Sequence, residues 1–250
     1  MSSGLIIVTG GARGIGASAC RQLAAAGYAV AVNYASDRKA AEATVAAIEK
    51  SGGRARAFRA DVADPEQVAK LFEDAVAALG PLAGLVNNAG VLGAFARVED
   101  LDPVELSRLF QVNVIGTILC AKEAVRRLST SHGGPGGSIV NISSVAARTG
   151  GLPSRAPYAA SKGAIETFTR GLANEVGREG IRVNAVAPGM IATDMSTPIL
   201  SAPGERERIA SSIPIGRLGE PDDIAEAIVW LISPAARYVT GSVMTVSGGR

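Results

Sequence analysis

The stretch TGGARGIG, residues 9–16, decides the fold. It follows an apolar run, Leu5–Thr9, that is expected to form a buried β-strand, and it opens a helical segment over 14–26. Glycines at a strand–helix turn let the backbone approach a pyrophosphate, and the free N–H groups and positive dipole of the helix favour that anion. A Walker-type phosphate loop is excluded because no Gly-Lys-Ser/Thr follows. The same glycines would also serve a tight turn that binds nothing.

Outward from this stretch, short β-branched runs alternate with longer helical segments. Strands are predicted over Leu5–Thr9, Ala29–Asn33, Arg56–Ala60, Gly84–Asn87, Ser138–Ile142, Arg182–Val186 and Val243–Val246, and helices over 14–26, 37–51, 65–79, 103–128, 157–178 and 221–232. Several strands are apolar throughout, which is typical of strands covered on both faces of a parallel sheet. The alternation predicts one α/β domain over 1–250, with a doubly wound sheet and helices on both faces.

Composition narrows the class of protein. Apolar residues make up 47% and charged residues 19% of the 250 residues, which excludes a disordered chain. Lys and Arg number 25 against 23 Asp and Glu, so no nucleic-acid partner is expected. Two cysteines and one histidine are too few for a structural zinc site, and no metal is predicted.

The sequence predicts a cytoplasmic protein without a membrane partner. The cysteines, Cys20 and Cys120, lie in apolar helical contexts typical of buried thiols in a reducing compartment. No secretory signal is expected, because Met1–Val8 lacks a cationic region and its apolar run is short. No apolar run approaches the roughly 18–20 residues of a membrane helix. The apolar excess is therefore expected in the core and at a subunit interface.

Four motifs together resemble the classical short-chain dehydrogenase/reductase family through nearly the whole chain. TGGARGIG is spaced like the family's Thr-Gly-x-x-x-Gly-x-Gly motif, and NNAG, residues 87–90, follows the fourth predicted strand as it does there. YAASK, residues 158–162, is similar to the Tyr-x-x-x-Lys catalytic motif, and Pro188-Gly189 follows the sixth strand. The resemblance implies a Rossmann-type fold with about seven parallel strands. It also implies hydride transfer between a nicotinamide dinucleotide and a carbonyl or secondary alcohol substrate.

Tyr158 and Lys162 are expected on one face of a helix, because they are four residues apart. A nearby ammonium favours the phenolate, and lowering a tyrosine pKa from near 10 to about 7 takes about 4 kcal/mol. Such a tyrosine can exchange a proton with the substrate oxygen. By resemblance, Ser144 orients that oxygen, and Asn113 helps to hold Lys162 and a proton-relay water.

NADP(H) is predicted as the preferred cofactor, with NAD(H) as second choice. The second strand ends in Asn33-Tyr34-Ala35-Ser36, without the acid that usually holds the ribose hydroxyl of NAD. Arg13 and Arg38 could bind a 2′-phosphate, although Arg38 could equally be a solvated helix charge, and Asp37 is expected to cap the second helix.

By resemblance, residues 61–62 contact the adenine, residues 88–90 line the ribose, and residues 188–193 frame the nicotinamide. The predicted cofactor-binding residues are Gly10, Arg13, Gly14, Ile15, Gly16, Asn33, Tyr34, Ala35, Ser36, Asp61, Val62, Asn88, Ala89, Gly90, Tyr158, Lys162, Pro188, Gly189, Ile191 and Thr193.

The substrate side departs from the commonest family pattern. One extra residue separates Ser144 from Tyr158, in the loop 148–157, and is expected to reshape the pocket mouth. The polar stretch 194–213 is predicted to be a substrate lid. Near the C-terminus, Ser247 stands where the family often has Asp, which affects one turn or interface contact.

Several functions stay open. A 3-oxoacyl-carrier-protein reductase often has a basic residue where this chain has Glu179, which weakens that alternative. A glucose-type sugar dehydrogenase remains, as does an NADP-binding regulatory or scaffold protein. A serine hydrolase is excluded because no Gly-x-Ser-x-Gly occurs. By resemblance, a homotetramer is expected, built from the helices over 103–128 and 157–178 and the last strand, with a dimer as second choice.

Overall fold

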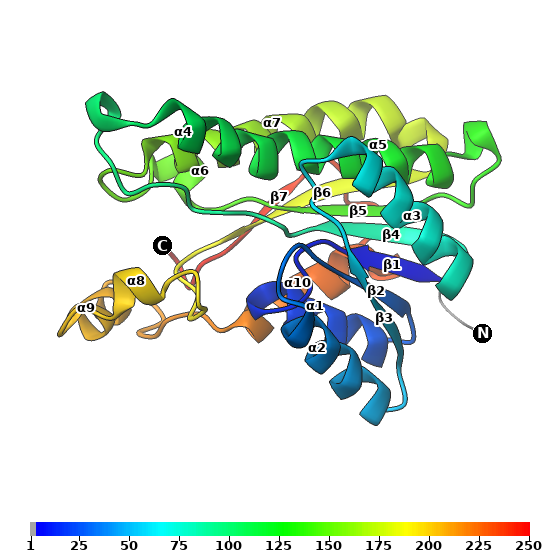
Figure 1. Ribbon diagram of the computed structural model, residues 1–250, viewed down its shortest axis with the longest axis horizontal. Helices are drawn as coiled ribbons and strands as arrows, with labels where there is room; N and C mark the ends of the chain where they lie inside the picture. The colour runs from blue at the N-terminus through cyan, green and yellow to red at the C-terminus, as the bar shows by residue number, and fades with distance from the viewer. Residues whose placement is uncertain (1–3) are drawn as a thin grey trace.

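The protein, described by a computed structural model over residues 4–250, is built on one parallel sheet of seven strands (Figure 1). The strands are β1 (Leu5–Val8), β2 (Ala29–Tyr34), β3 (Arg54–Arg59), β4 (Leu82–Asn87), β5 (Gly137–Ile142), β6 (Ile181–Pro188) and β7 (Val243–Val246). Their order across the sheet is β3-β2-β1-β4-β5-β6-β7. The predicted doubly wound Rossmann-type sheet is therefore confirmed.

Helices cover both faces of the sheet. They are α1 (Gly14–Ala25), α2 (Arg38–Lys50), α3 (Pro65–Leu79), α4 (Pro103–Phe110), α5 (Gly116–Leu128), α6 (Ala146–Thr149), α7 (Ala156–Val176), α8 (Thr197–Leu200), α9 (Glu205–Ser211) and α10 (Pro221–Ile232). Short 3₁₀ turns lie at Val98–Asp100, Thr130–His132, Gly177–Glu179 and Pro234–Ala236. In Figure 1, α3, α5 and α7 lie above the sheet, and α1, α2 and α10 lie below it.

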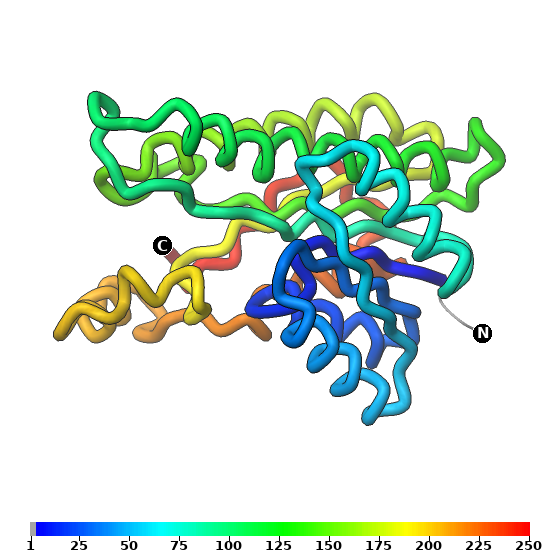
Figure 2. Tube along the Cα trace, in the orientation of Figure 1, coloured from blue at the N-terminus to red at the C-terminus, as the bar shows by residue number. Residues whose placement is uncertain are grey.

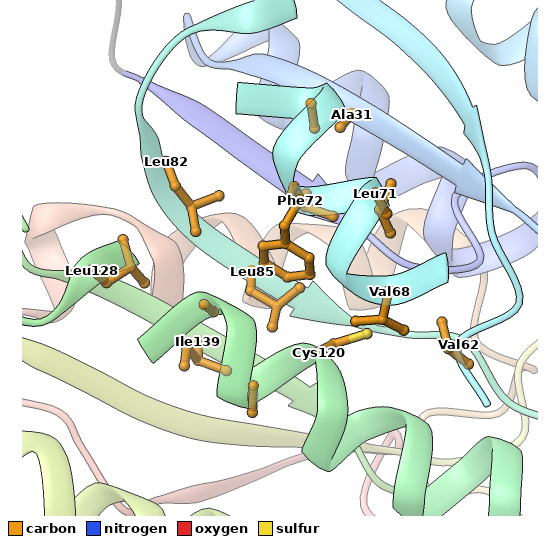
Figure 3. Close-up of a cluster of buried hydrophobic side chains, with 14 of the residues drawn as sticks. Ala31, Val62, Val68, Leu71, Phe72, Leu82, Leu85, Cys120, Leu128 and Ile139 are labelled. Carbon is orange, nitrogen blue, oxygen red and sulfur yellow. The ribbon is translucent and has the colours of Figure 1, made fainter. Parts of the chain in front are cut away.

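Two apolar cores separate the sheet from its helices. The core toward α3, α5 and α7 is centred on Phe72, which packs with Leu85, Cys120 and Ile139 (Figure 3). The core on the other face contains side chains of β1 and β2 together with Leu23 of α1 and Ile228 of α10. Both faces of the central strands are buried, and this explains why these strands are apolar at nearly every position in the sequence.

The sheet order reverses between β1 and β4, and this places the candidate site. From β1 the chain adds β2 and β3 on one side, and then β4 pairs with the other edge of β1. In open α/β sheets, the crevice at such a switch point, beyond the carboxyl ends of the strands, is where ligands bind. The glycine-rich loop after β1 and the segment after β4 both lie there.

The helix expected over 103–128 is interrupted. A π-helical segment, Gln111–Ile115, separates α4 from α5, and it contains Asn113. The whole run, Pro103–Leu128, is long and apolar enough to cross a membrane by length and composition, contrary to the expectation of no such run. Cys120, Ala121 and Ala124 of α5 lie in the core against the sheet, so we interpret the run as a core helix of the fold.

A separate extension carries the two short helices α8 and α9, which the sequence analysis did not anticipate within 194–213. The tube in Figure 2 shows it leaving the body after β6 and returning into α10. It has a small apolar cluster of its own, formed by Ile209, Ile213 and Leu218.

Candidate active site

The glycine-rich loop leaves the start of α1 without a side-chain cap. Helices α2, α3 and α4 each begin at an Asp whose carboxylate accepts backbone N–H groups: Asp37, as predicted, Asp64 and Asp102. Helix α1 follows Arg13, which makes no such bond. Since the first N–H groups of a helix have no partner within it, those of α1 remain open to an anion.

Glycines are required in this loop. Gly10 and Gly14 have φ of +61° and +52°, a region that favours glycine. A Cβ on Gly16 would collide with the carbonyl oxygen of Gly10. The backbone is therefore packed too closely for side chains, which suits close approach to a pyrophosphate.

Two predicted cofactor residues hold the loop in place. Asn88 Nδ2 donates to the carbonyl oxygens of Thr9 and Gly10 at 3.0 and 2.9 Å. Asn33 is buried, accepts the N–H of Gly10 at 3.2 Å and donates to the carbonyl of Ala60 at 3.0 Å. These amides connect the carboxyl ends of β2, β3 and β4 to the glycine-rich loop and thereby hold the loop in position.

Positive charge gathers where β2 ends. Arg13 is about 60% exposed, and its Nη1 lies 3.5 Å from Asp194 Oδ2 and 3.8 Å from Asp37 Oδ2. Arg38 Nε lies 2.7 Å from Glu42, which favours its interpretation as a solvated helix charge. Arg59, which the sequence analysis missed, donates from Nε to the carbonyl of Ala35 at 3.3 Å. Only the register of the two strands, Tyr34 opposite Arg59, brings this arginine to the site.

At the expected adenine end, Asp61 is tied to α4. Its Oδ2 lies 2.8 Å from Arg108 Nη2, and its Oδ1 accepts the N–H of Ala63 at 3.0 Å. Val62 beside it is buried. The carboxylate is thus oriented by an arginine that the sequence did not single out.

Helix α7 presents Tyr158 and Lys162 one turn apart. Lys162 is buried, and its Nζ donates to the carbonyl oxygen of Ile142 at 2.7 Å. The same nitrogen lies 5.8 Å from the centroid of the Tyr158 ring. Burial lowers the pKa of Lys162 to about 8, because the charged ammonium is poorly solvated there.

The environment of Tyr158 differs from the expectation. Burial raises the pKa of this phenol above its ordinary value, while a hydrogen bond with Ser144 and the charge of Arg155 oppose the rise. In the protein without cofactor, desolvation therefore outweighs the favourable charges, and the predicted depression toward 7 is not found. The Lys162 ammonium points to a backbone carbonyl instead.

Asn113 is fully engaged in the π-helical segment. Its side chain accepts the N–H of Val91 at 2.8 Å and donates to the carbonyl of Val91 at 2.9 Å and to Ser161 Oγ at 3.1 Å. A Cβ built on Gly90 would lie 3.3 Å from Asn113 Oδ1 and 3.6 Å from Lys162 Nζ, so both side chains flank Gly90. The amide fixes the segment after β4 next to α7.

The segment after β6 closes the other side of the site. Gly189 donates to the carbonyl of Val246 at 3.0 Å, and Ile191 forms a bridge with Gly219. Thr193 Cγ2 lies 3.3 Å from the Cβ position of Gly14, so this segment reaches the glycine-rich loop. Ser247 Oγ donates to the Arg250 carbonyl at 2.7 Å, a turn contact at the position where the family often has Asp.

A cavity of about 300 Å³ brings these groups together. Its wall contains Ser144, Tyr158 and Lys162 together with residues 188–191 and Thr193. The remaining lining is mainly apolar and includes Leu92, Val145, Leu152, Met190, Met195 and Ile199. The lining also includes Arg155 and Arg250, which the sequence analysis missed. A wider hollow of about 510 Å³ beside α4 holds none of the predicted catalytic groups.

The residues present fit a nicotinamide dinucleotide. The uncapped start of α1 and the tight glycine loop suit a pyrophosphate. At the other end, the buried Lys162 ammonium has one backbone acceptor and retains donors for ribose hydroxyls. The two ends lie on either side of the switch point, as an extended dinucleotide requires.

The chain is similar to known proteins along its whole length. The family described as enoyl-(acyl carrier protein) reductase matches residues 10–250. An uncharacterized oxidoreductase, YgfF of Escherichia coli (strain K12), is 46% identical over 98% of this chain and 99% of its own. Versicolorin reductase stcU of Emericella nidulans is 41% identical over 97% of this chain and 94% of its own.

The fold agrees with the sequence similarity. The crystal structure of a dehydrogenase/reductase from Sinorhizobium meliloti 1021 superimposes with a TM-score of 0.89 at 38% identity, covering 100% of this chain and 95% of that one. A tyrosine and lysine on one helix face, opposite a glycine-rich phosphate loop, therefore occur here within a shared fold and a shared sequence. The chain belongs to the short-chain dehydrogenase/reductase family, whose members use NAD(P)(H), and it is an oxidoreductase acting on CH–OH or C=O groups.

Proposed function

We propose that the protein is an NADP(H)-dependent oxidoreductase that interconverts a carbonyl compound and a secondary alcohol, with Tyr158 as the general acid and base. The observation that carries the proposal is that Ser144 and Tyr158 line the same mainly apolar cavity as the buried Lys162. Two hydroxyl groups that meet beside a cation can hold one substrate oxygen and exchange a proton with it.

Each residue has a distinct part in this reaction. The bound nicotinamide supplies or accepts the hydride. The Ser144 hydroxyl orients the substrate oxygen, and Tyr158 gives its proton to that oxygen during reduction or takes it during oxidation. Lys162 donates to the ribose and adds positive charge near the phenol. Asn113 acts as a positioning residue, because its amide joins the segment after β4 to α7.

The proposed preference for NADP(H) rests on the charges where β2 ends. No carboxylate occurs in Asn33–Ser36, so nothing there would repel a 2′-phosphate. Arg13 is exposed in the loop, and Arg59 reaches the carbonyl of Ala35. Two acids lie beside Arg13: Asp194 at 3.5 Å, and Asp37 at 3.8 Å, whose other oxygen caps α2 by accepting the N–H of Ala40 at 3.0 Å. NAD(H) is the second choice.

The apolar cavity favours a hydrophobic carbonyl substrate. Its side-chain lining contains no carboxylate, and aliphatic and methionine side chains predominate. Relatives at 38–41% identity carry the names elsinochrome, versicolorin and trihydroxynaphthalene reductase, which accord with such a pocket. Sugar dehydrogenation fits this lining less well. For a carrier-protein substrate, Glu179 is negative, and its carboxylate accepts the Ser129 hydroxyl at 2.5 Å.

We further propose a cytoplasmic homotetramer in which residues 194–213 act as a lid within a single domain. The lid is supported by the first part of this stretch, because Met195 and Ser196 before α8 and Ile199 within α8 belong to the cavity wall. Exposed apolar residues on α4 and α5 support the assembly, as argued in the Discussion.

A binding titration followed by a substrate screen tests the proposal. NADPH and NADH are titrated into the pure protein by nucleotide fluorescence, and hydrophobic, sugar and acyl-thioester carbonyls are then screened by nicotinamide absorbance. We expect tighter NADPH binding and turnover of a hydrophobic ketone. Tight NADPH binding without turnover of any class would favour the regulatory or scaffold alternative. Faster turnover of an acyl-thioester or a sugar would contradict the proposed substrate class.

A further inference from the structure

Arg155 is a buried cation without a carboxylate partner. It lies immediately before α7, in the connection between Ser144 and Tyr158 that carries the extra residue, and it lines the cavity. Only 9% of the residue is exposed. Over residues 4–250 no acidic side chain forms an ion pair with it. Buried charges are normally paired, so this guanidinium requires a counter-charge.

The guanidinium is held rigidly by neutral groups. Nη1 donates to the carbonyl oxygens of Gly93 and Leu92 at 2.7 and 3.2 Å. The Phe95 ring covers it, with 4.8 Å between the guanidinium carbon and the ring centroid. Its Nε–H is buried and has no acceptor. The charge is therefore fixed in place and poorly solvated, which strengthens its field on nearby groups.

The group that such a charge can act on is Tyr158, three residues along the chain and in the same cavity wall. Arg155 is the N-cap position of α7 and Tyr158 lies in its first turn, so both residues stand at the end of the helix that faces this cavity. We propose that Arg155 is a positioning residue that stabilises negative charge on the Tyr158 oxygen when that oxygen has given its proton to the substrate. The inference rests on the proposed function, in which Tyr158 is the proton donor.

The step is balanced in atoms and charge. The O–H bond of Tyr158 breaks and an O–H bond forms on the substrate oxygen, while the substrate carbon receives the hydride that the dehydrogenase reaction supplies. The phenolate left behind carries one negative charge beside the guanidinium. A proton from solvent restores the phenol, and the reverse sequence operates in oxidation.

Other charged groups near Tyr158 are less suited to this task. Lys162 on α7 is bonded to the Ile142 carbonyl, and burial lowers its pKa to about 8, so it loses charge in mildly alkaline solution. A guanidinium stays charged. Arg250 lines the same cavity but is exposed to solvent, and Glu105 of α4, which lines a small hollow beside Tyr158, is exposed as well. The field of Arg155 also acts to lower the pKa of the Tyr158 phenol.

A matched pair of substitutions separates charge from structure. Arg155→Gln keeps an N–H donor for the Gly93 carbonyl but removes the charge, and Arg155→Lys keeps the charge. The phenol pKa is read by NMR of ¹³Cζ-labelled tyrosine in the full-length protein without cofactor, with Tyr158→Phe identifying the signal among four tyrosines. We expect Arg155→Gln to raise the Tyr158 pKa by about one unit and Arg155→Lys to leave it near the wild-type value.

Two further variants complete the design. Arg148→Gln, at an exposed position of the same connection, should leave the Tyr158 pKa unchanged. Phe95→Leu, at a residue that is 63% exposed, admits water to the guanidinium and should raise the Tyr158 pKa by a smaller amount. This variant keeps the test possible if Arg155→Gln fails to fold. In reduction, which requires the protonated phenol, kcat/KM should fall at a higher pH in Arg155→Gln than in the wild type.

The inference is overturned if Arg155→Gln leaves the Tyr158 pKa unchanged, or if the Gln and Lys variants raise it equally. An unchanged pKa with a tenfold higher KM only for carboxylate-bearing carbonyls would assign Arg155 to substrate binding instead. Failure of the proposed function is a separate outcome: the wild type would bind NADPH without turnover, while the NMR titration would still test the charge of Arg155.

Discussion

At the scale of single residues, the proposed chemistry depends on one oxygen atom, the hydroxyl of Tyr158. Tyr158→Phe removes only this atom, so folding and NADPH binding should be retained. Because general acid catalysis contributes about 10²–10⁴-fold, kcat should fall by at least that factor. Steady-state kinetics on the best carbonyl, with NADPH binding measured by fluorescence, check this. Turnover near the wild-type rate would show that another group supplies the proton.

The buried ammonium of Lys162 makes stability depend on pH in a defined direction. Its pKa is about 8 in the folded protein, whereas a lysine in the unfolded chain titrates near 10.4. Between these values only the unfolded chain holds the proton, so the free energy of unfolding should rise with pH across this window, by about 3 kcal/mol in total.

Denaturant unfolding of the cofactor-free wild type and Lys162→Met between pH 7 and 10.5 tests this. Burial raises the pKa of Tyr158 and Cys120, and these groups titrate in both proteins, so the difference between the two curves isolates the lysine. A difference that stays constant with pH would mean that Lys162 keeps an ordinary pKa in the folded protein.

Arg13 provides a residue-scale test of cofactor choice. Arg13→Glu places a negative charge near the expected 2′-phosphate, so the Kd for NADPH should rise much more than the Kd for NADH. Arg38→Glu is the matched control, because Arg38 is already engaged with Glu42. Equal weakening of both nucleotides in Arg13→Glu would show that this arginine does not contact the 2′-phosphate.

At the scale of elements, the π-helical segment Gln111–Ile115 links the segment after β4 to α7 through one amide. Asn113→Ala would remove the hydrogen bonds of this amide to the N–H and C=O of Val91 and to Ser161 Oγ, each worth about 0.5–1.5 kcal/mol. We therefore expect a lower free energy of unfolding and a lower kcat. Denaturant unfolding and kinetics measure these, with Asn113→Asp as the control that retains the acceptor. Unchanged stability in the Ala variant would contradict the structural part.

The elements that could be predicted are those whose signals are local in sequence. Short strand-forming runs, several of them apolar throughout, predicted the seven strands, and Asp37 predicted the start of α2. The π-helical segment was missed, because its side-chain bonds join Asn113 to residues 22 and 48 positions away. The short helices α8 and α9 were missed because, at four and seven residues, they are too short to show a helical period in the sequence.

The sequence predicted only those residues of the candidate site that belong to short sequence motifs. Ser144, Tyr158 and Lys162 meet in the cavity as expected. Arg155, Arg59 and Arg108 were missed, since each reaches its partner through tertiary packing. The direction of the Tyr158 pKa was missed as well, because burial, which has no local signal in the sequence, outweighs the nearby charges.

At the scale of the whole molecule, apolar surface remains on the outer side of α4 and α5. Val104 of α4 is 74% exposed, Ile118 of α5 is 37% exposed, and Ile115 between them is 41% exposed. Leaving such side chains in water is unfavourable, and burying them against a second copy of the chain would remove that cost. If α4 and α5 pack against a second copy of the chain and the edge strand β7 packs against another copy, these two kinds of contact would form a closed tetramer.

This arrangement predicts a mass near four times 25.4 kDa by light scattering at micromolar concentration. Ile118→Glu should reduce the mass to that of a dimer, because a charge buried against a second copy is strongly unfavourable. Ala78→Glu, on the exposed side of α3, introduces the same charge away from the expected interface and should leave the mass unchanged. A wild-type mass near 25.4 kDa would reject both the tetramer and the dimer. Ile118 does not line the cavity that contains Tyr158 and Lys162, so its substitution tests the assembly alone. A tetramer that survives Ile118→Glu would show that α4 and α5 do not form the interface.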